Sequence, residues 1–144
     1  ILIEVLSAAI RHEVEILNQI VKMDLSAKQK LEKSVATFVK RAMHSPQLAY
    51  SLIFEPVDSE MEHARFQSKQ LIKQTIQEVL AEGKNNGTFT FEDINIAALG
   101  IVGAMTFVVI EPLNPSHNVV FDQAYIDHFV QQIADFCVNA VQRP

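Results

Sequence analysis

The chain has 144 residues, a length that suits a single domain with one core. Apolar residues make up 49% of it and charged residues 20%, so the composition excludes a disordered tail. Four glycines and five prolines are too few for an all-β fold, in which a turn falls about every ten residues. The single cysteine, Cys137, excludes an internal disulfide framework and a cysteine-based zinc site, and it fits a reducing, cytoplasmic setting.

The excess acidic charge of the chain is confined to its last part. Residues 1–84 contain eleven Lys and Arg residues and eleven Asp and Glu residues, so their charges balance. Residues 85–144 contain one basic residue, Arg143, and six acidic residues, which accounts for the net charge of −5. No segment clusters Lys and Arg as a surface for duplex DNA requires. We therefore expect that these residues do not bind DNA themselves.

The spacing of the apolar residues predicts six helices in an all-α fold. Ser26 and Gln29 have the spacing of a capping box, and Asp122 is suited to cap the last helix. The segment 83–87 is the strongest break, and Thr90 is expected to cap the helix that follows, with acidic residues in its first turn. The helices are expected at about residues 1–22, 27–43, 46–54, 59–82, 92–110 and 123–141.

The fifth predicted helix differs from the others because residues 96–110 contain no charge and only one polar side chain, Thr106. A helix that is apolar on every side is either buried on every side or spans a membrane. This run of fifteen residues is shorter than the roughly 20 that cross a bilayer, so we predict burial and no membrane contact. Gly100 and Gly103 would let another helix approach closely. The last two long helices thus have more apolar surface than one chain can bury, which predicts a second copy.

No arrangement of residues favours metal binding or catalysis. Glu60 and His63 have the Glu-x-x-His spacing of di-iron helical bundles, but such a site needs two copies and the chain has one. The five histidines form no His-x-x-x-His pair, and no glycine-rich phosphate loop occurs. We therefore expect no metal, no cofactor and no enzymatic activity. A helical metalloenzyme is the alternative that bound iron or manganese would support.

The third predicted helix is short and nearly all apolar, with Tyr50 and Phe54 one turn apart. It either fills the core or lines a cavity between the longer helices. An apolar pocket with a few polar groups is typical of a small-molecule site, and His12, His44 and Thr106 join Tyr50 as candidates for those groups. The alternative for His12 is a place at the boundary of core and solvent. The fourth helix has an uncharged polar stripe that forms a wall of this cavity, a helix–helix seam or a solvated face: Gln67, Gln70, Gln74 and Gln77.

The order of the predicted helices and the segment EGKNNGTFTFEDINIAALGIVGAMTF, residues 82–107, resemble the C-terminal regulatory domain of TetR/AcrR-type transcriptional repressors. In that family a glycine-containing turn precedes a Gly-x-Phe sequence, an aspartate and a helix rich in small apolar residues. The first predicted helix is similar to the family's linker helix. The positions that match this pattern are Gly87, Phe89, Asp93, Ala97, Ala98 and Gly103.

The resemblance implies a bacterial, cytoplasmic repressor whose DNA-binding helix-turn-helix domain lies upstream of residue 1. Members of the family are homodimers in which the last two long helices of each copy form a four-helix bundle. Their effector pocket lies among the first five helices of the regulatory domain, and a bound effector moves the linker helix and weakens operator binding. Residues 1–144 are accordingly expected to form one domain that contacts operator DNA only through the upstream domain.

We therefore predict a ligand-responsive repressor domain that binds a small, largely apolar effector and forms a homodimer. The alternative is a stand-alone helical carrier of an apolar ligand. The predicted ligand-binding residues are His12, Phe38, Met43, Tyr50, Phe54 and Phe107. The predicted dimer-interface residues are Ile101, Met105, Ile126, Phe129, Ile133 and Phe136.

Overall fold

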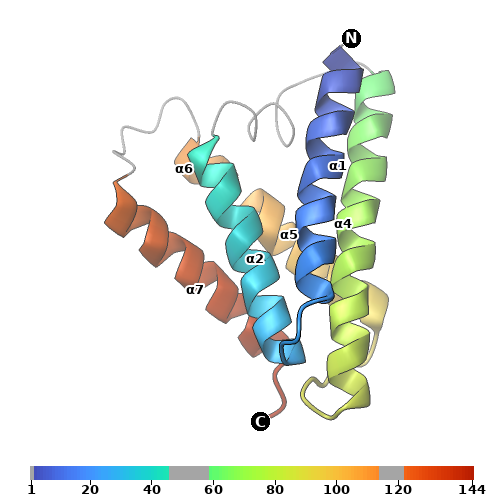
Figure 1. Ribbon diagram of the computed structural model, residues 1–144, viewed down its shortest axis with the longest axis vertical. Helices are drawn as coiled ribbons and strands as arrows, with labels where there is room; N and C mark the ends of the chain where they lie inside the picture. Colours follow the sequence, from blue (N-terminus) through green and yellow to red (C-terminus); the bar gives the residue numbers. More distant parts are fainter. Residues whose placement is uncertain (1, 46–58, 114–121) are drawn as a thin grey trace.

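The computed structural model describes residues 2–45, 59–113 and 122–144. Within these ranges the chain is helical and forms no strand beyond one isolated bridge between Phe89 and Gln142 (Figure 1). The all-α prediction is confirmed, while the helix predicted at residues 46–54 lies outside the described residues. The helices are α1 (Leu2–Val21), α2 (Ala27–His44), α4 (Ser59–Asn85), α5 (Ile94–Phe107), α6 (Ile110–Leu113) and α7 (Gln123–Val141).

The helix α2 lies at the centre of the fold, where it contacts α1, α4, α5 and α7. Its residues Leu31, Val35 and Val39 follow one another at steps of four, and all three are fully buried. This spacing places them on one face of a helix, which is the face that forms the core. In Figure 1, α1 and α4 run side by side in the same direction on one side of α2, and α7 lies on the other side.

Two of the predicted helix caps are confirmed. The Gln29 N–H donates to Ser26 Oγ at 3.2 Å, and the Ser26 N–H donates to Gln29 Oε1 at 3.0 Å, which completes the capping box. At α7 the Tyr125 N–H donates to Asp122 Oδ1 at 2.8 Å. These caps follow from local sequence alone, because each satisfies amide groups that the first turn of a helix leaves unpaired.

The start of α5 differs from the prediction. Asp93 caps the helix by accepting a hydrogen bond from the Ile96 N–H at 3.1 Å, so α5 begins at Ile94 with no acidic residue in its first turn. Thr90 is used elsewhere, because its N–H donates to the Val141 carbonyl at 2.8 Å. That bond ties the end of α7 to the turn between α4 and α5.

The break predicted at residues 83–87 begins three residues late, at Asn86, because α4 continues through Gly83 to Asn85. Gly83 is buried, and a Cβ atom at this position would collide with the Phe89 ring, which packs on the bare backbone. Gly83 is therefore required for close packing and not for a turn. Gly87 makes the turn, with a φ of 83° that disfavours any side chain.

The fifth helix is also shorter than predicted, because α5 ends at Phe107 and the short helix α6 follows after two turn residues. Pro112 in α6 gives the physical reason. A proline has no N–H to donate, and within one continuous helix its ring would clash with the carbonyl four residues earlier, at Val108. In the described part of the chain, no helix is long and apolar enough to cross a membrane.

Candidate functional site

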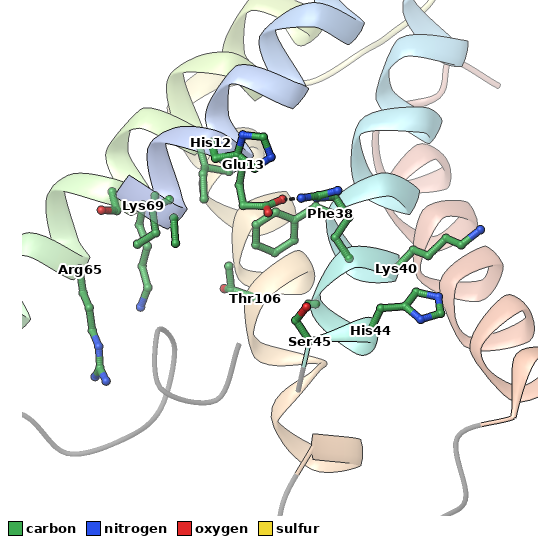
Figure 2. Close-up of a pocket in the computed structure, with 15 residues that line it drawn as sticks. His12, Glu13, Phe38, Lys40, His44, Ser45, Arg65, Lys69 and Thr106 are labelled. Atoms are coloured by element: carbon green, nitrogen blue, oxygen red, sulfur yellow. Dashed lines mark hydrogen bonds and ion pairs between the residues drawn. The ribbon is translucent and has the colours of Figure 1, made fainter. Parts of the chain in front are cut away.

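A cavity of about 410 Å³ lies among α1, α2, α4 and α5 (Figure 2). Its volume falls within the range of roughly 300–1,000 Å³ that is usual for small-molecule sites. Buried apolar side chains form part of its wall, and the aromatic ring of Phe38 is half-buried beside them. The apolar residues that line it are Ala9, Ile10, Phe38, Ala42 and Ile72.

Each of the three longer helices presents one face to the cavity. On α4 the lining residues include Arg65, Lys69 and Ile72, which lie at steps of four and three. On α2 the lining residues Arg41 and Ala42 lie three and four positions after Phe38. Residues three and four apart share a helix face, so the register of each helix decides which side chains meet in the cavity.

An ion pair joins α1 to α2 at the edge of the cavity. The Arg41 Nε donates to Glu13 Oε2 at 2.7 Å. This hydrogen bond raises the pKa of the Arg41 guanidinium above its ordinary value; partial burial opposes that shift and the charge of Glu13 adds to it. The Arg41 guanidinium therefore stays charged, and the Glu13 carboxylate is its hydrogen-bond partner.

The wall formed by α4 is basic. Arg65 is only 7% exposed, and its Nη1 donates to Glu62 Oε1 at 3.0 Å. Lys69, one turn further along, is half-buried and makes no hydrogen bond or ion pair with any residue in the described ranges. In Figure 2 the side chains of Arg65 and Lys69 extend the same way from α4, and Thr106 of α5 lies between them and Ser45 of α2.

Two buried hydroxyl groups of the wall already donate their protons within their own helices. The Thr106 Oγ1 donates to the Val102 carbonyl, and the Ser68 Oγ donates to the Ala64 carbonyl, both at 2.8 Å. Such bonds satisfy the hydroxyl proton and leave the oxygen free to accept. The two hydroxyls can therefore accept a hydrogen bond from a ligand without losing their present one.

The cavity brings together four residues that the sequence analysis singled out: His12, Phe38, His44 and Thr106 all line it. Met43 is 2% exposed and belongs to the core, and it is not among the lining residues. Tyr50 and Phe54 lie outside the described residues. Phe107 follows Thr106 but points to the other side of α5, where it is 72% exposed. The glutamine stripe of α4 does not line the cavity; Gln67 and Gln74 are exposed, while Gln70 and Gln77 are half-buried.

Sequence reasoning missed the charged residues of the wall. The available signal was the helical register of α4, because Arg65 and Lys69 fall on the same stripe as Ser68 and Ile72, which are buried. Among the described residues no group of three or more His, Cys, Asp and Glu side chains could hold a metal ion.

The residues predicted for a dimer interface fall into three groups. Ile101, Met105 and Ile126 are buried within the protomer, and Phe129 and Ile133 are half-buried against the same core. Phe136 is 66% exposed on α7. The exposed side of α5 has large apolar residues that the sequence analysis did not choose: Ile96 is 61% exposed and Leu99 is 51% exposed.

Comparison with known proteins assigns the chain to a family. Its residues 24–110 match the profile described as "Tetracyclin repressor-like, C-terminal domain", which is more than half of the chain. The chain belongs to this family, and the predicted resemblance is confirmed. It is therefore the C-terminal domain of a transcriptional regulator of the TetR type. No curated protein gives a significant match.

Two solved structures share the fold. A transcriptional regulator of the TetR/AcrR family from Thermobifida fusca superposes with a TM-score of 0.74 at 15% identity, over 99% of this chain and 73% of that one. A bacterial regulatory protein of the tetR family from Rhodococcus superposes with a TM-score of 0.63 at 20% identity, over 94% of this chain and 72% of that one. At these identities the likeness concerns the arrangement of the helices.

Proposed function

We propose that the chain is the effector-binding and dimerisation domain of a ligand-responsive repressor. The cavity among α1, α2, α4 and α5, found in a chain of this family, is the observation that carries the proposal. Its partly apolar wall suits a small, largely apolar effector. The DNA-binding function belongs to a helix-turn-helix domain that precedes α1, and no chemistry is assigned to the domain itself. The regulator works in a bacterial cytoplasm, where its operator lies.

Effector binding reaches the DNA-binding domain through α1. This helix contributes Ala9, Ile10 and Glu13 to the cavity, and the Glu13–Arg41 ion pair couples it to α2. A ligand between α1 and its neighbours changes the direction of α1, and with it the separation of the paired DNA-binding domains. The coupling requires two conformations that differ in this separation, and a ligand that binds one of them more tightly. A ligand with equal affinity for both conformations does not change their populations.

Dimerisation uses the outer side of α5 together with α7, which packs against it. The side chains of Ile96, Leu99 and Phe107 on α5 and of Phe136 on α7 are each more than half exposed in the protomer. A Cβ atom at Gly100 would meet no other atom within 4 Å. Exposed apolar side chains around small residues are typical of a helix–helix interface, and a two-fold pair of such faces closes into a four-helix bundle.

The binding proposal is tested with a matched pair of alanine variants and decan-1-ol as an uncharged apolar ligand. Ala9 lines the cavity and is half-buried, whereas its neighbour Ala8 is exposed and does not line it. We expect isothermal titration calorimetry to show that decan-1-ol binds the unmodified chain and Ala8→Phe equally well. Its binding to Ala9→Phe should be lost, because only this phenylalanine fills the cavity. Binding of decan-1-ol that Ala9→Phe leaves intact would contradict the proposal. The family match favours this regulatory function over that of a stand-alone carrier.

A further inference from the structure

The charges on the cavity wall define the class of effector. Resting on the proposed function, we propose that the effector is an amphipathic anion, with an apolar body and a carboxylate or similar headgroup held beside Lys69. The apolar body would contact Ile10, Phe38 and Ile72.

Cations outnumber anions on the wall. Among the described residues, four Lys and Arg side chains line the cavity and one carboxylate does, that of Glu13. Glu13 is committed to Arg41 at 2.7 Å. The partner of Arg65 is Glu62, whose side chain is 60% exposed and does not line the cavity. Once these two pairs are formed, no carboxylate among the described lining residues is left for Lys40 or Lys69.

Lys69 is the cation that needs an anion. Its side chain is half-buried, and a charge withdrawn from water is costly unless it is paired. No hydrogen bond or ion pair joins it to a described residue, and α5, which forms part of the wall, has no charged residue between Ile94 and Phe107. Arg65 lies four positions earlier on α4, where like charges repel each other. An anion near Lys69 removes both penalties.

The basic residues that line the cavity do not all face its interior. Lys40 and His44 are exposed on α2, and in the view of Figure 2 their side chains extend away from α4. The cationic groups that face the interior are therefore those of α4. The hydroxyls of Ser68 and Thr106 donate within their helices, so recognition of an anion falls to Lys69.

Three ligands with the same ten-carbon tail test the headgroup: decanoate, decan-1-ol and decylamine, each below the concentration at which it forms micelles. We expect decanoate to bind the unmodified chain at least about tenfold more tightly than decan-1-ol, and decylamine to bind more weakly than either. Raising the salt concentration should weaken the binding of decanoate and leave that of decan-1-ol unchanged, because salt screens charges. Isothermal titration calorimetry measures all three affinities.

Variants assign the preference to Lys69. In Lys69→Gln the affinity for decanoate should fall about tenfold, to that of decan-1-ol, whereas Lys69→Arg should retain the preference for the anion. The control is Lys33→Gln, because Lys33 is exposed on α2 and does not line the cavity. Circular dichroism of each variant shows whether it is folded.

The possible outcomes separate this inference from the proposed function. If decan-1-ol binds as tightly as decanoate, or if Lys69→Gln keeps the preference for decanoate, the cavity binds apolar ligands but the anionic effector is contradicted. If none of the three ligands binds, both the inference and the effector-binding function are contradicted. Tight binding of decanoate that is lost in Lys69→Gln and kept in Lys33→Gln supports the inference.

Discussion

The two sides of α5 have similar compositions but different surroundings. Ala98 and Met105 on the inner side are completely buried, whereas Ile96 and Leu99 on the outer side are more than half exposed. Burial within one chain accounts for the apolar character of the inner side only. A helix side that faces solvent usually has polar residues, so contact with solvent does not explain the isoleucine and leucine on the outer side. The simplest physical explanation is that another protein surface covers them.

The same contrast occurs between adjacent residues of α7. Cys137 is 1% exposed and packs in the core, whereas the preceding residue, Phe136, is 66% exposed. Successive residues of a helix point in directions about 100° apart, so one position marks the protomer core and the next marks the outer face. Substitutions on the two sides should therefore affect different quantities: the free energy of unfolding on the inner side, and association on the outer side.

The largest effect is expected on the inner side of α5. Met105→Ala should lower the free energy of unfolding by about 2–5 kcal/mol, because it leaves a cavity in a fully packed site. Leu99→Ala, measured at a protein concentration low enough to keep the chain monomeric, should cost less than about 1 kcal/mol. Urea denaturation followed by circular dichroism gives both values. Equal decreases in the free energy of unfolding for Met105→Ala and Leu99→Ala would contradict the claim that only the inner side of α5 packs in the protomer core.

Glycines provide a second comparison, because they occur in both environments. Gly83→Ala should cost about 1–3 kcal/mol, since the added methyl group collides with the Phe89 ring. In Gly103→Ala the methyl group meets nothing within 4 Å, and the better helix propensity should stabilise the monomer by up to about 1 kcal/mol while association weakens. Thermal unfolding at low concentration and sedimentation at high concentration measure the two effects. A destabilised monomer of Gly103→Ala would show that this face is packed within the protomer.

The pH dependence of Cys137 tests the inner side of α7. Burial raises the pKa of the Cys137 thiol from 9.0 to about 11, so the folded state keeps the thiol neutral where the unfolded chain ionises it. Its contribution to stability is therefore complete below pH 9 and is lost as the pH rises toward 11. Between pH 9 and 11 the free energy of unfolding should therefore fall more in the unmodified chain than in Cys137→Ala, which has no thiol. Urea denaturation at several pH values measures this difference. Rapid alkylation of the folded thiol by iodoacetamide at pH 9 would contradict its burial.

The smallest effect on stability is expected at the edge of the cavity. Glu13→Gln removes the charge that pairs with Arg41, but the Arg41 side chain is 42% exposed, so the loss should be within about 1 kcal/mol. Although the loss of stability is small, Glu13→Gln should weaken the contact between α1 and α2, so the α1 amides should exchange faster. Hydrogen exchange of the α1 amides, compared between the two proteins, measures this effect, and unchanged exchange would contradict the role of the ion pair.

Local signals predicted much of the fold. The all-α class and the caps at Ser26 and Asp122 follow from residues close together in the sequence, and the structure confirms them. The end of α5 was predicted too late in the sequence. Pro112 prevents one continuous helix, because its ring would clash with the carbonyl one turn earlier, at Val108. Gly83 was interpreted as a helix break because its contact with Phe89 involves a residue beyond the turn.

The candidate site was less predictable because it depends on the relative register of several helices. On α5 the predicted interface residues Ile101 and Met105 lie in the core. A helix that is apolar on every side has no periodic pattern to show which side faces inward. The basic wall formed by Arg65 and Lys69 was missed for a related reason: their positions on α4 are clear, but only packing shows that this face meets α1 and α2.

The central claim is that a second copy of this chain covers the outer face of α5 and α7, and sedimentation equilibrium tests it most directly. At high protein concentration the unmodified chain should have twice the monomer mass of 16.2 kDa, and Phe136→Glu should shift it to the monomer while the protein stays folded. A single species of 16.2 kDa for the unmodified chain, at every concentration reached, would contradict the claim.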